Sequence, residues 1–438
     1  LHNSLFTLRD QEIKKGMSVR GGRRLTHKTE NKQQSEKSSK ALGKESLQNW
    51  LRSASRRPKE LESLLQEFQE FMAKFLETVV QKHKPATFEK SVDQLLKSCF
   101  PTPSKQQSIR IQLWKGHSYE TFGAWDKALA AYRRVIELCD SQSLSGFKAE
   151  AYLWIGHIKL MQNQTRAALN AYQTSLKLSQ DCKDEKAIAN SYHGLAYYYF
   201  EQGNSRNATS YWERSLEIAE KIKDKELIAK VTTNLGVVTN VQGSWEKALA
   251  YYGKSLSQVE KIGDARGLAE TYHNMAMTYA DAERWADAGA HYEKSHKLAK
   301  KVGDVHLQAL VKLNRVELHL AIGDSEVAEA LCQQALQEFS RLEDHLGEAD
   351  AFKFLGVIRA GWRDWSAAKS FFEKSLRLTR KFQNLLCEAE TRFEFGKMLK
   401  QKGNKKSAQK QLERALSLFT EIKAKKDIQK VKRQLSTL

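Results

Sequence analysis

Residues 234–256 read NLGVVTNVQGSWEKALAYYGKSL, and the spacing of their small and aromatic residues returns along the chain in steps of 40. Gly236, Gly243, Ala248, Tyr252 and Ser255 mark five positions of this pattern. Steps of 40 from Ala248 meet an alanine every time, at Ala128, Ala168, Ala208, Ala288, Ala328, Ala368 and Ala408. The pattern thus occurs eight times in one register without an insertion. Such a period predicts a solenoid, in which each unit stacks on its neighbours to bury its apolar face.

Two further positions indicate what one unit looks like. Four residues after each alanine stands a residue that is mostly aromatic, and this series is Tyr132, Tyr172, Trp212, Tyr252, Tyr292, Cys332, Phe372 and Leu412. Twelve residues before each alanine the residue is small in every copy but one, and this series is Gly116, Gly156, Ala196, Gly236, Ala276, Val316, Gly356 and Gly396. Small residues let two helix backbones approach closely. In several copies a glycine follows seven positions later, as at Gly203, Gly243, Gly323 and Gly403, where a left-handed residue can end a helix. Each unit is therefore predicted to be two antiparallel helices joined by a tight turn.

This pattern resembles the tetratricopeptide repeat, over residues 108–420. The resemblance implies an all-α fold, a right-handed superhelical solenoid of about eight antiparallel helix pairs with capping helices. The period of 40 is longer than the usual repeat of that family, and the proline that commonly follows the second helix is missing. In both respects the chain is similar to a long-helix subgroup that includes kinesin light chains, Pins-type polarity adaptors and bacterial tetratricopeptide-repeat regulators.

Composition divides the chain into four parts. Residues 1–45 are basic and polar and are expected to be a disordered tail. Residues 46–103 are expected to form a helical cap or degenerate repeat, because apolar residues in 61–80 follow helical spacing. The alternative for the 61–80 helix is contact with another chain or a membrane surface. Residues 104–420 hold the eight repeats, and 421–438 are expected to form a basic C-terminal capping helix.

The formal net charge is +20, and the excess lies mainly in the first 60 residues and the last 39. Basic ends can attract nucleic acid or an anionic surface in a salt-sensitive manner. The alternative is that these residues are simply solvated.

The five cysteines are an odd number without a close pair, which favours reduced thiols used in packing. No run of 18 apolar residues occurs, and the N-terminus lacks the apolar core of a signal peptide. We therefore expect a cytoplasmic or nuclear protein without a transmembrane segment.

No phosphate loop, Cys-x-x-Cys pair or Gly-x-Ser-x-Gly motif is present, so we expect no catalytic residue and no cofactor. The twelve histidines do not predict a metal site, because His117 and His157 stand one whole repeat apart. A metal would need several ligands converging at roughly 2 Å. A recurring Asp or Asn before each first helix is expected to cap that helix, at Asp184, Asp224, Asp264, Asp304, Asp344 and Asn384.

The resemblance also implies candidate binding residues, because the first helix of each pair lines the concave groove in that family. Asn234, Asn274 and Asn314 stand at one groove position of three consecutive units. Such amides can hydrogen-bond the backbone of an extended peptide, although they could instead bond neighbouring helices. The other candidate groove residues are His117, His157 and Tyr197 at a second position, His193 and His273 at a third, and Phe200 and Asn240 at a fourth.

These observations lead to a first hypothesis and two alternatives. The first is a non-enzymatic scaffold that binds a peptide or helix of a partner protein in the groove. The second is a regulator that contacts nucleic acid or an anionic surface through the basic termini, and the third is self-assembly through the 61–80 helix. The sequence names neither the partner nor the oligomeric state.

Overall fold

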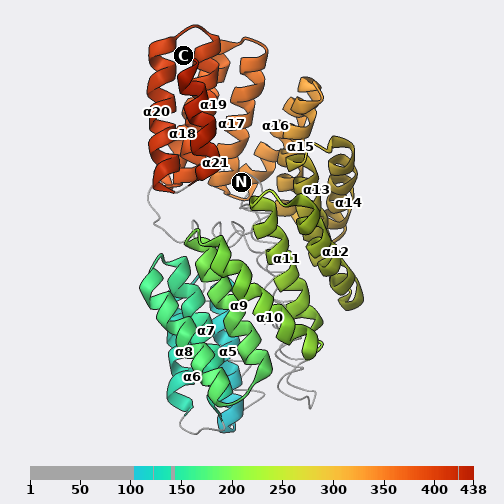
Figure 1. Ribbon diagram of the computed structural model, residues 1–438, viewed down its shortest axis with the longest axis vertical. Helices are drawn as coiled ribbons and strands as arrows, with labels where there is room; N and C mark the ends of the chain where they lie inside the picture. Colours follow the sequence, from blue (N-terminus) through green and yellow to red (C-terminus); the bar gives the residue numbers. More distant parts are fainter. Residues whose placement is uncertain (1–102, 122, 140–143, 423) are drawn as a thin grey trace, which may run out of the picture. The chain divides into compact units, whose positions relative to one another are not determined.

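The computed structural model describes residues 103–121, 123–139, 144–422 and 424–438, and these residues form helices joined by short turns, with no strand among them (Figure 1). The predictions for the tail at 1–45 and for the helix at 61–80 lie outside the described residues. The predicted cap at 46–103 lies outside them as well, apart from its last residue. The division of the chain into tail, cap and repeats therefore stays a prediction.

Seventeen helices occur in the described residues. Their bounds are α5 (Lys105–Thr121), α6 (Trp125–Leu138), α7 (Ser145–Met161), α8 (Thr165–Asp181), α9 (Glu185–Glu201), α10 (Ser205–Lys221), α11 (Lys225–Val241), α12 (Trp245–Ile262), α13 (Ala265–Asp281), α14 (Trp285–Lys301), α15 (Val305–Ala321), α16 (Ser325–Arg341), α17 (His345–Gly361), α18 (Trp365–Lys381), α19 (Leu385–Gln401), α20 (Lys405–Glu421) and α21 (Lys425–Ser436).

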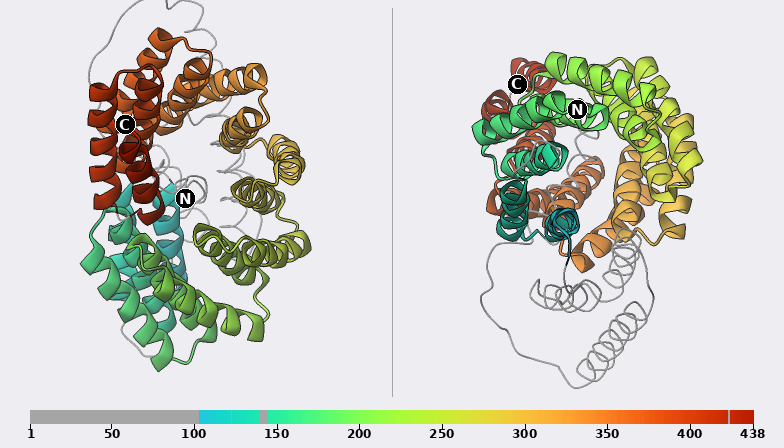
Figure 2. Two further views of the ribbon diagram at one scale, coloured as in Figure 1. Left: turned by 45° about the horizontal axis from the view of Figure 1, so that its top comes forward. Right: turned by 90° about the horizontal axis from the view of Figure 1, so that it is seen from below.

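The helices belong to two compact units, which we call the N-terminal unit, ending at Tyr198, and the C-terminal unit, from Tyr199 to Leu438. The boundary falls inside α9. In the N-terminal unit α5 packs on α6, α6 on α7 and α7 on α8. In the C-terminal unit every helix from α10 to α21 packs on the next, and Figure 2 shows these helices following one another in colour order. Such stacking of consecutive helices confirms the all-α solenoid.

Each pair of helices is antiparallel because its turn is short. Three residues separate α11 from α12, whereas each helix is about 25 Å long at 1.5 Å per residue. The middle turn residue takes the left-handed conformation, with φ of 80° at Gly243 and 85° at Gly403. Where glycine is absent, another residue adopts it, as at Glu283 with φ 57° and Arg363 with φ 59°. The turn therefore depends on this conformation, while glycine only makes it less strained.

The recurring acidic and amide residues before the first helices cap them, as expected. Asp224 Oδ1 accepts from the Leu227 amide at 3.0 Å, and Asn384 Oδ1 accepts from the Cys387 amide at 2.9 Å. The equivalent bonds at Asp184, Asp264, Asp304 and Asp344 start α9, α13, α15 and α17. Each cap satisfies an amide that the first turn of a helix cannot bond internally.

The residues at the repeat positions form the core of both units. All eight register alanines have no exposed surface, and the residue four places later is at most 1% exposed in every copy. A Cβ built at Gly236 would lie 2.5 Å from the Tyr252 ring, and one at Gly356 would lie 2.8 Å from the Phe372 ring. The small residue of the first helix thus makes room for the ring of the second.

The sixth copy deviates at both of these positions together. Val316 replaces the small residue and Cys332 replaces the ring, and the two side chains belong to one apolar cluster in which neither is exposed. The larger side chain on one helix fills the space that the smaller one on the other leaves open. Cys139 and Cys387 are buried like Cys332, as expected for packing thiols.

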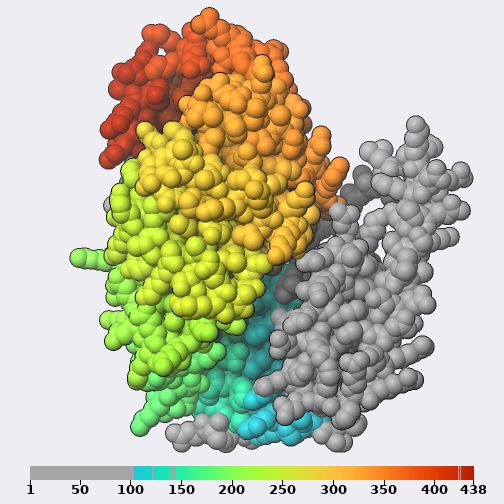
Figure 3. All heavy atoms as spheres, turned by 90° about the vertical axis from the view of Figure 1, so that its right-hand side faces the viewer, coloured from blue at the N-terminus to red at the C-terminus, as the bar shows by residue number. Residues whose placement is uncertain are grey.

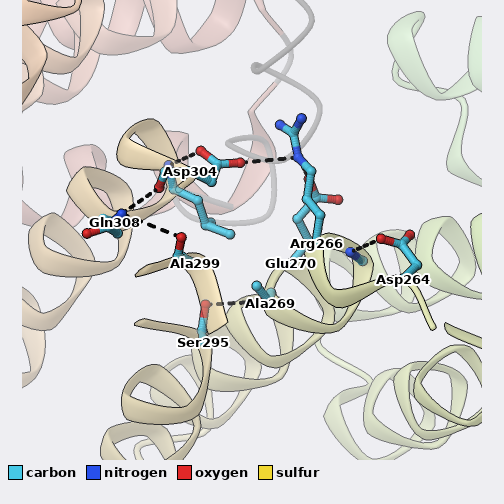
Figure 4. A network of polar contacts seen from close by, with 10 residues as sticks. Asp264, Arg266, Ala269, Glu270, Ser295, Ala299, Asp304 and Gln308 are labelled. Atoms are coloured by element: carbon cyan, nitrogen blue, oxygen red, sulfur yellow. Dashed lines mark hydrogen bonds and ion pairs between the residues drawn. The ribbon is translucent and has the colours of Figure 1, made fainter. Parts of the chain in front are cut away.

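Buried hydroxyls and turn residues tie neighbouring helices together. Ser295 Oγ donates to the Ala269 carbonyl at 2.8 Å, which joins α14 to α13 of the same pair (Figure 4). Within α13 Arg266 lies 3.0 Å from Glu270. It also lies 3.1 Å from Asp304, the residue that caps α15, so that α13 is linked to the start of α15. The space-filling view shows the side chains of residues 250–340, yellow to orange, as a closely packed surface (Figure 3).

The first helices of the C-terminal unit form a row of their own. α11 contacts α13, α13 contacts α15, α15 contacts α17 and α17 contacts α19, in addition to the contacts between consecutive helices. Among the described residues no second helix has a comparable contact with the next second helix. We call α11, α13, α15, α17 and α19 the first-helix row. Because these helices approach one another, side chains from different repeats can meet along the row.

Candidate functional site

The N-terminal unit brings three of the candidate residues into one aromatic row. His117 of α5 lies edge-on to the Trp154 ring of α7, with ring centroids 4.5 Å apart. Trp154 in turn lies 5.8 Å from His157, and His157 lies 6.3 Å from Tyr197 of α9. His193, also on α9, is half-buried. The row joins α5, α7 and α9, the first helices of three successive pairs.

Burial favours the neutral form of two titratable groups on α5, His117 and Glu120. It lowers the pKa of His117 to about 4, because the imidazolium is poorly solvated there. For the same reason burial raises the pKa of Glu120 to about 8, although the nearby Tyr132 hydroxyl opposes the shift. The neutral His117 ring beside Trp154 favours apolar or aromatic groups over ions.

The C-terminal unit joins successive first helices through amide side chains. The Asn314 amide nitrogen of α15 lies 3.1 Å from His273 Nε2 and 3.4 Å from Met277 Sδ, both on α13. Asn240 of α11 donates to Asp281 Oδ2 of α13 at 2.8 Å. Each bond therefore reaches from one first helix to the next along the row.

These amides differ in accessibility. Asn274 is 0% exposed, Asn314 is 3% exposed and Asn240 is 4% exposed. Asn234, at the same register position as Asn274 and Asn314, is only half-buried. For Asn314 the geometry agrees with the alternative that such amides bond neighbouring helices, and the peptide-clamp role of the three asparagines stays a prediction.

The remaining candidate is aromatic and faces its own pair. Phe200 is 8% exposed, and its ring lies 5.7 Å from the Trp212 ring of α10. The candidates of the C-terminal unit therefore comprise asparagine side chains on α11, α13 and α15, the imidazole of His273 on α13, and Phe200 near the start of that unit.

Comparison with known families agrees with the helix pairs described above. Models described as tetratricopeptide repeat match residues 187–261, 227–301, 307–381 and 389–420, which together make up about half of the chain. The chain belongs to the tetratricopeptide-repeat family. A comparison with curated proteins gave no match.

Three solved structures place this tetratricopeptide-repeat protein among similar folds. The apo form of the quorum sensor NprR from B. thuringiensis has a TM-score of 0.53 and 17% identity, over 77% of this chain and 98% of that one. A Rap protein complexed with competence and sporulation factor has a TM-score of 0.51 and 14% identity, over 76% and 98%. A signal-transduction ATPase with numerous domains and a tetratricopeptide repeat sensor, from Pyrococcus horikoshii, has a TM-score of 0.56 and 16% identity, over 86% of this chain and 55% of that one. At these identities the likeness shows the fold alone.

The sequence analysis did not predict one cluster of buried charges in the first-helix row. Lys353 Nζ of α17 lies 3.2 Å from Asp350 Oδ1 and 2.8 Å from Glu390 Oε2 of α19, and these side chains are 5%, 2% and 4% exposed. Burial alone would lower the pKa of Lys353, but Asp350 and Glu390 outweigh it and hold that pKa above its usual value.

The same acids and the Cys387 thiol lie within 4.8 Å of one another, as metal ligands could. The Lys353 ammonium bonds both acids and so supplies positive charge there. The signal that could have predicted this cluster is that Asp350 and Glu390 stand 40 residues apart, at one register position.

Proposed function

We propose that this chain is a non-enzymatic scaffold or sensor that binds an extended segment of a partner protein along the first-helix row of the C-terminal unit. The observation that carries the proposal is a pair of side-chain hydrogen bonds between successive first helices. One joins Asn240 of α11 to Asp281 of α13, and the other joins His273 of α13 to Asn314 of α15. Amide and imidazole groups that already bond across repeats can exchange those bonds for the backbone of a peptide.

The fold neighbours support this proposal by analogy. One Rap protein is complexed with competence and sporulation factor, and the Rap conjugation regulator of plasmid pLS20 is in complex with the Phr* peptide. That this chain also binds a peptide is inferred from the shared fold, and the residues proposed to bind it are those of the first-helix row.

Asn234 is the residue on which the proposal is tested most directly. It is half-buried, whereas Asn274 and Asn314 are enclosed, so a peptide reaches Asn234 without first breaking the stack. We expect Asn234→Ala to leave thermal stability nearly unchanged and to weaken peptide binding. The measurement is panning of a displayed random-peptide library against the full chain, followed by affinity titration of the selected peptides with the parent chain and the variant.

The control is Asn170→Ala, which removes an exposed asparagine from the second helix α8. Peptides that bind parent and both variants alike would contradict a role for the row. Asn314→Ala provides the opposite comparison, because it removes the contact with His273 and should lower stability as well as binding.

A further inference from the structure

The last repeats of the C-terminal unit carry an uneven distribution of exposed charge. The exposed basic side chains of α18, α20 and α21 define what we call the C-terminal basic face. They are Lys369, Lys374, Arg377, Arg380, Lys381, Lys405, Lys406, Lys410, Arg414, Lys426, Lys430, Lys432 and Arg433. The exposed acids within these three helices are Glu373, Glu413 and Glu421. α18 and α20 both pack on α19, and α21 packs on α20, so the face belongs to one stack (Figure 1).

The bases on this face outnumber the exposed acids that could pair with them, whereas two bases of the earlier second helices α12 and α14 have an acidic partner. Lys254 of α12 pairs with Glu220, and Lys297 of α14 lies 3.7 Å from Glu293. Within the described part of the chain Arg377, Lys406 and Lys432 have no ion-pair partner. Like charges on packed helices repel one another, and an anionic ligand would relieve that repulsion.

The surroundings of these bases indicate the class of anion. No large apolar side chain of α18, α20 or α21 is exposed among those described. Trp362, in the turn before α18, is 41% exposed, and the Arg359 guanidinium covers its ring at 5.0 Å. A peripheral membrane protein normally inserts apolar groups beside its bases, and a single-strand binder presents aromatic rings for stacking. Neither feature accompanies this face.

We propose that the C-terminal basic face binds the phosphate backbone of double-stranded nucleic acid without reading its sequence. Lysine and arginine side chains would release the counterions of the duplex, which makes the binding steeply dependent on salt. The proposal does not involve the first-helix row, so it stands or falls independently of peptide binding.

The test uses the full chain and a fluorescent duplex of about 25 base pairs, titrated by anisotropy at several salt concentrations. The face variant combines Arg377→Gln, Lys406→Gln, Lys410→Gln and Lys432→Gln. The control variant removes the same charge from α12 and α14, through Lys261→Gln, Lys297→Gln, Lys300→Gln and Lys301→Gln, all at exposed positions. Circular dichroism checks that both variants are folded.

We expect the face variant to lose about tenfold or more in affinity and the slope of log affinity against log salt to become less negative by roughly 3. The control variant should change affinity by less than about threefold. Equal losses of affinity in both variants would mean that only the net charge of the chain matters. Unchanged affinity in both variants would mean that another part of the chain binds the duplex. Either result overturns the proposal. Vesicles containing phosphatidylserine form a second arm. Binding of vesicles but not of duplex by the parent chain would identify an anionic lipid surface instead.

Discussion

At the scale of single residues, the ring of each helix pair depends on one small partner. Gly236 lies so close to Tyr252 that an added methyl group has no room, whereas Gly253 on α12 has open space where its Cβ would be. Two glycines of the same pair therefore have opposite roles. Gly236 permits close packing, while Gly253 only weakens its helix.

Substitution by alanine should separate these roles. We expect Gly236→Ala to destabilise the protein by about 1–3 kcal/mol through overpacking against Tyr252. Gly253→Ala should stabilise it by about 0.5–1 kcal/mol, because alanine favours a helix more than glycine does. Urea unfolding followed by circular dichroism measures both. A stabilising effect of Gly236→Ala would mean that the ring moves away at no cost.

The buried Lys353 cluster allows a second test at this scale. Lys353→Met leaves Asp350 and Glu390 buried without their cation, and we expect it to cost about 3–5 kcal/mol. Lys297→Met breaks a surface pair whose side chains are 74% and 45% exposed, and should cost less than about 1 kcal/mol. Equal losses in the free energy of unfolding for the two variants would show that the buried cluster stabilises the protein no more than a surface pair does.

At the scale of helices, caps and turns repeat because each depends on chemistry within a few residues. The caps and most of the core were predictable from the 40-residue register for that reason. The bonds from Asn314 to His273 and from Asn240 to Asp281 were not, because they join residues 41 apart on different first helices. How closely α13 approaches α11 and α15 depends on packing of whole pairs, which a register position does not report.

A cap deletion tests the element scale. Asp224→Ala removes the acceptor for the Leu227 amide at the start of α11, and we expect a loss of about 1 kcal/mol. Asp224→Asn keeps an acceptor oxygen and should lower the stability by only a few tenths of ~1 kcal/mol. Thermal unfolding of both variants beside the parent chain provides the comparison. If the two variants lost equal stability, the charge rather than the hydrogen bond would be the stabilising feature.

At the scale of the whole molecule, a stack of repeats is held by contacts between neighbours, so each part has its own local stability. Comparison with solved folds adds no site to this picture, because identities of 14–17% report the fold alone. Within the described residues no helix is long and apolar enough to cross a membrane. Because each part of the solenoid has its own local stability, a change of pH that affects one helix pair should destabilise that pair first.

Glu120 provides such a local pH dependence. Its pKa is raised from 4.5 to about 8, so the folded state holds its proton more tightly than the unfolded state. The stability that follows is fully present below pH 4.5 and is lost as the pH rises through 8. Glu120→Gln should remove this loss, so that α5 and α6 are better protected in the variant than in the parent at pH 9. Hydrogen exchange of the backbone amides, corrected for intrinsic rates, measures the protection of α5 and α6, with α19 and α20 as the internal reference. Equal protection of α5 and α6 in both chains at pH 9 would contradict the shifted pKa.

The joint replacement at Val316 and Cys332 has a consequence for how such a gene can be rearranged. Each first helix is fitted to the second helix of its own pair, and this fit differs between the sixth copy and the others. A recombination joint inside a pair could unite Val316 with a bulky ring, and the hybrid would be overfilled. A joint at the turns that separate pairs, such as those at Gly263 and Gly303, preserves the match between the two helices of each pair. Descendants of this gene can thus gain or lose repeats safely in whole pairs, counted from one such turn to the next.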